Sequence, residues 1–145
     1  MNEKQPDVRI VRTLPAPRRR VFEAWLNADA LRQFMCPAEG SHVSKVEVDP
    51  RVGGSFLVMM NVGGEDRPHR GEYRAIEPHE RLEFTWRSAH AGERSHVVLN
   101  FRDAARGHTE LTLEHFGLPA EPAPTQHLGG WTHIVGMLEK HPFGD

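Results

Sequence analysis

Five stretches between residues 43 and 116 alternate apolar and polar side chains, which is the pattern of strands with one buried face, and a sixth, SFLVMMNV, is apolar on both faces. They are VSKVEVD (43–49), SFLVMMNV (55–62), GEYRAIE (71–77), RLEFTWRS (81–88), SHVVLNFR (95–102) and TELTLEHF (109–116). Short turns such as EPHE (77–80) separate some of them, which favours antiparallel pairing. A sheet with one apolar face needs a second layer of structure to cover that face.

Helices at the two ends of the chain can supply this second layer. A first strand, VRIVRT (8–13), precedes Pro17, which is suited to open a short helix, and Asn27 is suited to cap a second one over 28–34. A longer helix closes the chain, from near residue 121 or 125 to about 140. We therefore predict an α+β fold in which a curved antiparallel sheet of about six to seven strands wraps around the C-terminal helix, with two short helices after the first strand.

Composition limits the class of protein. The chain has 145 residues, 38% of them hydrophobic and 26% charged, so we expect one domain over 1–145 with its core over about 8–140. A net charge of -2 gives no general attraction to nucleic acid or to anionic membranes. Cys36 is the only cysteine, and the sequence shows neither a long apolar run nor a signal peptide. We expect a cytoplasmic protein that binds neither nucleic acid nor membranes.

No motif in the sequence indicates a cofactor, a metal ion or a catalytic group. The glycine pairs in RVGGSF (51–56) and NVGGED (61–66) are typical of turns between strands and not of phosphate-binding loops. The ten histidines are scattered, and His127 and His133 are predicted to point to different sides of the last helix. We predict no metal site, no cofactor and no catalytic residue.

Two adjacent glycines weaken the last helix just before its bulkiest residue, Trp131. Each glycine in a helix interior costs about 1 kcal/mol relative to alanine. Gly130 lies on the flank of the apolar face of this helix, so its missing side chain either lets the helix approach the sheet or leaves room beside Trp131. Gly129 lies on the outer face, where this explanation does not apply.

Five phrases of the sequence, in order, resemble successive motifs of the START-like SRPBCC superfamily. They are APRRRVFEAWLNADALRQFMCP, RVGGSF, GEYRAIEPHERLEFTW, TELTLEHFGL and HLGGWTHIVGML. The most similar branch is named after the activator of the heat-shock-protein-90 ATPase, and the resemblance covers residues 8 to about 140. It implies a helix-grip fold, in which the curved sheet wraps the C-terminal helix around an interior cavity. The eukaryotic co-chaperones of this branch carry a separate N-terminal domain with no counterpart here, so we expect no stimulation of a chaperone ATPase.

The inward-facing residues of the sheet and the last helix are the candidate ligand-binding residues. They are Trp25, Phe34, Phe56, Met60, Tyr73, Phe84, Trp86, Leu99, Leu113, His115, His127, Trp131 and Ile134. His115 and His127 are expected to meet at the mouth of the cavity, where they can bond a polar ligand group or act as acid and base. The alternatives are a Trp131 that fills the core and leaves no cavity, and two partly exposed histidines at the ends of their elements.

We expect the protein to bind a small, largely apolar ligand in this cavity, with no reaction assigned. The first alternative is a chaperone-associated interaction module, and the second is an enzyme acting on a hydrophobic substrate in the same cavity. The cations at 18–20 are either a solvated helix face or a surface for an anionic partner. The small outward residues Gly129, Thr132 and Gly136 can also seat a second copy of the chain in a homodimer.

Overall fold

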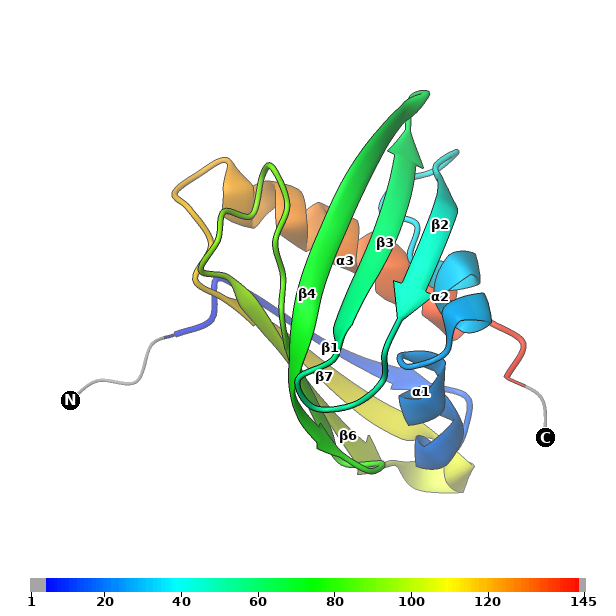
Figure 1. Cartoon of the computed structure of the whole chain (residues 1–145). Helices are drawn as coiled ribbons and strands as arrows, with labels where there is room; N and C mark the ends of the chain where they lie inside the picture. The colour runs from blue at the N-terminus through cyan, green and yellow to red at the C-terminus, as the bar shows by residue number, and fades with distance from the viewer. Residues whose placement is uncertain (1–4, 144–145) are drawn as a thin grey trace.

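The computed structural model describes residues 5–143, which form a strongly curved antiparallel sheet around a long helix (Figure 1). Seven strands are hydrogen-bonded in the order β1-β7-β6-β5-β4-β3-β2 within this range. Their bounds are β1 Val8–Leu14, β2 His42–Val48, β3 Ser55–Val62, β4 Glu65–Glu77, β5 Arg81–Thr85, β6 His96–Asp103 and β7 Thr109–Phe116. The strands β2 to β7, which follow the short helices, pair in chain order and form one continuous meander. The first strand, β1, pairs with the last, β7.

Three helices accompany the sheet. The short helices α1 (Arg18–Ala24) and α2 (Ala28–Phe34) follow β1, and α3 (Ala123–Glu139) lies across the concave face of the sheet (Figure 1). The side chain of Asn27 caps α2 as predicted, because it accepts a hydrogen bond of 2.9 Å from the backbone N–H of Ala30. The α+β helix-grip fold expected from the sequence is therefore confirmed.

The strand β4 curves as it passes from one pairing partner to the other (Figure 1), and this bend divides the sheet into two parts. The first half of β4 pairs with β3, and its second half pairs with β5 after a register shift between Tyr73 and Ala75. At the bend, a Cβ added to Gly71 would overlap the carbonyl oxygen of Thr85 and the ring of Phe56. Glycine is required here because the backbone and an aromatic ring occupy the space of a side chain.

Aromatic rings fill the interior below this bend. Phe56 lies 5.4 Å from both Tyr73 and Phe84, and Trp25 lies 5.0 Å from Phe34, measured between ring centroids. Such edge-to-face and tilted pairs are the preferred packing of aromatic side chains. From α3 the buried side chains are Ala123, Trp131, Ile134, Val135 and Leu138.

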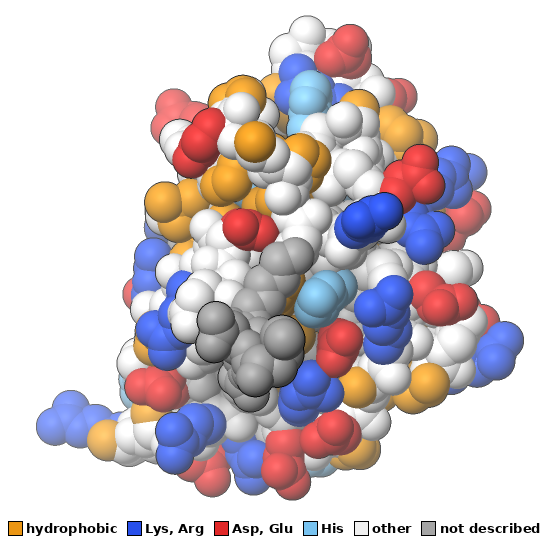
Figure 2. Space-filling view, turned by 90° about the vertical axis from the view of Figure 1, so that its left-hand side faces the viewer, with side chains coloured by type: hydrophobic (Ala, Val, Ile, Leu, Met, Phe, Trp, Pro, Cys, Tyr) orange, Lys and Arg blue, Asp and Glu red, His pale blue; other side chains and the backbone are white. Residues whose placement is uncertain are grey.

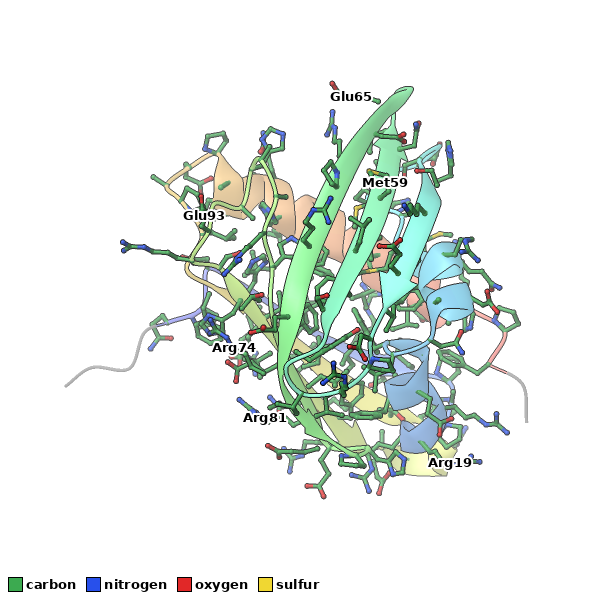
Figure 3. The ribbon with its side chains drawn as sticks, in the orientation of Figure 1. Arg19, Met59, Glu65, Arg74, Arg81 and Glu93 are labelled. Atoms are coloured by element: carbon green, nitrogen blue, oxygen red, sulfur yellow. The ribbon has the colours of Figure 1, made fainter. Side chains whose placement is uncertain are left out.

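The first arginine of the run at 18–20 has a structural role. Arg18 Nε lies 3.1 Å from Asp103 Oδ1, and its Nη1 donates to the carbonyl oxygen of His79 at 3.1 Å. These bonds tie the start of α1 to the end of β6 and to the β4–β5 turn. Arg19 instead projects away from the sheet at the outer side of α1 (Figure 3), so a solvated face describes this residue and not Arg18.

Within residues 5–143, no helix has the length and apolar character needed to cross a membrane.

Replacing Gly71 should test the bend. Gly71→Ala places a methyl group against the Thr85 carbonyl and the Phe56 ring. We therefore expect the free energy of unfolding to fall by about 1–3 kcal/mol, which is the usual cost of overpacking. Gly129→Ala is the matched control, because a Cβ there meets nothing within 4 Å and gains helix propensity of about 1 kcal/mol. Urea unfolding of the wild type and of both variants measures these changes. A Gly71→Ala variant as stable as the wild type would contradict the requirement for glycine at the bend.

Candidate ligand-binding cavity

A cavity of about 830 Å³ lies between the upper part of the sheet and residues 126–134 of α3. Four segments supply its walls: the β3–β4 hairpin, the loop after β5, the connection between α2 and β2, and α3 itself. The hairpin, with Glu65 near its tip, rises well above the rest of the sheet (Figure 3). On the face that includes this end of α3, hydrophobic side chains gather at the upper left (Figure 2).

Two tryptophans and two aliphatic side chains form the apolar wall of the cavity. The rings of Trp86 and Trp131 lie 4.9 Å apart between centroids and are tilted by 50°. Met60 from β3 and Ile134 from α3 line the same space. Gly130 also lines it, and a Cβ built there would meet only Pro37 Cβ, at an ordinary contact distance of 3.7 Å. The missing side chain therefore leaves open space beside Trp131.

Trp131 is held in place by a buried histidine. Its Nε1 donates a hydrogen bond of 2.9 Å to Nδ1 of His115, whose side chain is completely buried. Because Nδ1 is the acceptor, His115 is neutral and carries its proton on Nε2. Burial, with smaller contributions from His127 and His96, lowers the pKa of His115 to about 3. The structure thus places His115 behind the cavity wall, whereas we expected it at the mouth.

His127 lies at the cavity itself. Its ring stands at 88° to that of His115, with 5.2 Å between centroids, so the two rings are in contact. Nδ1 of His127 donates to the carbonyl oxygen of Ala123 at 2.8 Å. Burial is the main cause that lowers its pKa, and nearby His90 lowers it further, while the bond to Ala123 opposes the shift. His127 therefore favours the neutral state.

A third histidine, His69 on β4, lines the cavity from the opposite side. Its ring lies 5.1 Å from that of Trp86, and its Nδ1 donates to the carbonyl oxygen of Arg67 at 3.0 Å. Burial lowers the pKa of His69 to about 4, although the bond to Arg67 opposes the shift. The histidines on the two sides of the cavity are thus both biased toward the neutral form.

The charged groups of the cavity belong to the β3–β4 hairpin and have partners on this hairpin and on β2. Arg67 Nε lies 3.2 Å from Glu65 Oε1. Asp66 accepts hydrogen bonds from Asn61 at 2.9 Å and from Ser44 at 3.1 Å. Within residues 5–143, no group of three or more His, Cys, Asp or Glu side chains is arranged to hold a metal ion.

The structure separates the thirteen residues predicted to bind ligand into three sets. Those that line the cavity are Met60, Trp86, His127, Trp131 and Ile134. Those that surround a void of only about 10 Å³ in the lower interior are Trp25, Phe56, Tyr73 and Phe84. Those that are buried without lining either space are Phe34, Leu99, Leu113 and His115. A void of this size has room for about one water molecule and not for a ligand.

The sequence interpretation missed the polar residues of the cavity, among them Ser88, His90 and Gln126 in addition to His69. His69 was missed because the stretch EDRPHR (65–70) is charged and contains a proline, which is unfavourable in a central strand. The structure nevertheless begins β4 at Glu65. Alternation from Tyr73 back through Gly71 to His69 was the signal that would have placed this histidine on the inner face.

Comparisons with known proteins agree with this fold. The family model described as Activator of Hsp90 ATPase homolog 1-like protein matches residues 15–141. No curated protein matches the chain significantly. The crystal structure of protein CV1439 from Chromobacterium violaceum is 29% identical, with a TM-score of 0.85 over 95% of this chain and 98% of that one. The AHSA1 protein from Silicibacter pomeroyi is 26% identical, with a TM-score of 0.76 over 92% of this chain and 94% of that one.

Stability in acid should report the buried histidine. Between pH 6.5 and about 3, the unfolded chain protonates His115 while the folded chain keeps it neutral, so the free energy of unfolding falls as the pH is lowered. The contribution of one such histidine is at most about 1.4 kcal/mol per pH unit. His115→Asn retains an acceptor for Trp131 and does not titrate, so its stability should depend less steeply on pH. Urea unfolding between about pH 7 and 4.5 measures both slopes, and equal slopes would contradict a neutral buried His115.

Proposed function

Because the chain belongs to the Activator of Hsp90 ATPase homolog 1-like family, we propose that it binds a small, largely apolar ligand in the cavity between the sheet and α3. The volume of about 830 Å³ supports this, since cavities of about 300–1,000 Å³ are typical of small-molecule sites. Its wall combines aromatic and aliphatic side chains with the polar groups of His69, Ser88, His90, Gln126 and His127, and the hairpin adds the charges of Glu65, Asp66 and Arg67. Apolar walls with a few oriented polar groups are the usual composition of such sites.

The main support for the proposal is the difference in packing between the two halves of the interior. Below the bend in β4, aromatic rings leave only about 10 Å³, so this chain can pack a dense core. In the upper half, Gly130 occupies a position where a side chain would project beside Trp131. Space left open by a glycine in an otherwise close-packed protein supports a site that a ligand fills.

The geometry gives His115 no direct contact with a ligand. Of the two histidines we considered as acid and base, His115 accepts the indole N–H of Trp131 and is buried behind it, whereas His127 lines the cavity. A group that acts on a substrate must come within hydrogen-bond reach of it, and Trp131 occupies that position. This arrangement supports a positioning role for His115 toward the cavity wall.

The description of the family favours a second candidate function, an activating contact with the Hsp90 ATPase. Such a contact would use the outer surface of the protein and not the cavity. A variant whose cavity is filled should retain it, so an ATPase assay on that variant separates the two functions.

Filling the cavity should abolish ligand binding without destabilising the protein. Gly130→Leu directs a side chain into the space beside Trp131 and gains helix propensity, which is worth nearly 1 kcal/mol over glycine. We expect a neutral or raised free energy of unfolding and loss of binding of N-phenyl-1-naphthylamine, an apolar probe whose fluorescence rises on binding. Thermal melts and a probe titration measure the two properties.

Gly129→Leu is the matched control for this substitution. It has the same gain in helix propensity, but its side chain lies on the exposed outer face of α3 with nothing within 4 Å of the Cβ. This variant should bind the probe as the wild type does. Clear destabilisation by Gly130→Leu, together with a wild type that binds no probe, would contradict the proposed function and leave Gly130 as a packing residue.

A further inference from the structure

The chemistry of the cavity restricts the ligand further than its apolar wall does. Arg67 is the only lysine or arginine among the described residues that line it. This guanidinium already pairs with Glu65 at 3.2 Å, and Asp66 lines the same rim. A bound carboxylate would therefore meet two acidic groups and no unpaired cation, and burying an unpaired carboxylate is very costly.

The histidines do not supply the missing positive charge. His127 faces His115 on β7, His69 on β4 and His90 on the loop after β5, besides the rim charges of Glu65, Asp66 and Arg67. Burial and repulsion by neighbouring histidines both favour its neutral form. A neutral imidazole presents one N–H donor and one nitrogen acceptor.

The backbone decides which nitrogen of His127 is the acceptor. Nδ1 donates to the carbonyl oxygen of Ala123, so the proton lies on Nδ1 and Nε2 carries the free lone pair. No residue within 5–143 bonds to Nε2, and this atom is not among the buried polar atoms without a partner. Since His127 lines the cavity, Nε2 is an accessible hydrogen-bond acceptor at its wall.

We propose that His127 determines specificity by accepting a hydrogen bond from a neutral hydroxyl group of the ligand, whose apolar ring packs against Trp86 and Trp131. This inference rests on the proposed function, because it concerns the same cavity. A hydroxyl donor satisfies Nε2 without adding charge beside Glu65 and Asp66. A ring has the shape and polarisability to contact the two tilted indoles, which lie 4.9 Å apart.

Three naphthalene derivatives of similar size test the proposal at pH 7.5 by isothermal titration calorimetry. 2-Naphthol offers a neutral O–H donor, 2-methoxynaphthalene has no donor, and 2-naphthoate is an anion. We expect the wild type to bind 2-naphthol roughly three- to tenfold more tightly than 2-methoxynaphthalene, which is the effect of one neutral hydrogen bond. It should bind 2-naphthoate most weakly.

Variants of α3 locate the effect. His127→Phe keeps an aromatic ring but has no acceptor, so it should bind 2-methoxynaphthalene with unchanged affinity and lose the preference for 2-naphthol. His127→Gln offers Oε1 as an acceptor and should keep part of the preference. His133→Phe is the matched control, because His133 lies on the same helix, does not line the cavity and bonds to the Cys36 carbonyl oxygen.

The possible failures of the two proposals are distinguishable. Binding of both neutral compounds with equal affinity, blocked by Gly130→Leu, would retain the cavity and overturn the role of His127. Tightest binding of 2-naphthoate would overturn it as well. Absence of binding of all three compounds, or binding that Gly130→Leu leaves unchanged, would overturn the proposed function and this inference together.

Discussion

The hydrogen bond between Trp131 and His115 joins the C-terminal helix to β7, the strand beside the β1 edge of the sheet. It spans 2.9 Å between two buried side chains, so breaking it would leave polar groups without partners in the interior. The ring of Trp131 also contacts the rings of Trp25 and Trp86, with centroid distances of 6.4 Å and 4.9 Å. Trp131 thus fixes α3 to β7 at one wall of the cavity.

A second constraint divides the interior into a filled and an open half. Gly71 lets β4 bend so that Phe56 packs against its backbone, and the lower rings then close the space almost completely. Above the bend, the β3–β4 hairpin rises past α3 (Figure 1), and Gly130 adds no side chain to fill the space between them. The cavity follows from these two glycines as much as from the large residues around it.

Alternation of apolar and polar residues predicted the strands, and Asn27 predicted the start of α2, because both signals are local. Alternation shows which face a residue occupies and not how deep it lies. Phe56 and Met60 share one face of β3, yet one closes the core and the other lines the cavity. The charged stretch at 65–70 concealed His69, because its inward position depends on pairing with β3 across the hairpin. The burial of His115 likewise arises from Trp131, sixteen residues later.

Contacts between a bound probe and individual side chains test the cavity most directly. Isotope-filtered NMR on labelled protein with unlabelled N-phenyl-1-naphthylamine measures nuclear Overhauser effects from the probe to assigned methyl groups. We predict contacts to Met60 and Ile134, which line the cavity, and none to Leu128 and Val52, whose side chains are exposed. Contacts to Leu128 or Val52 without contacts to Met60 and Ile134 would contradict a ligand site between the sheet and α3.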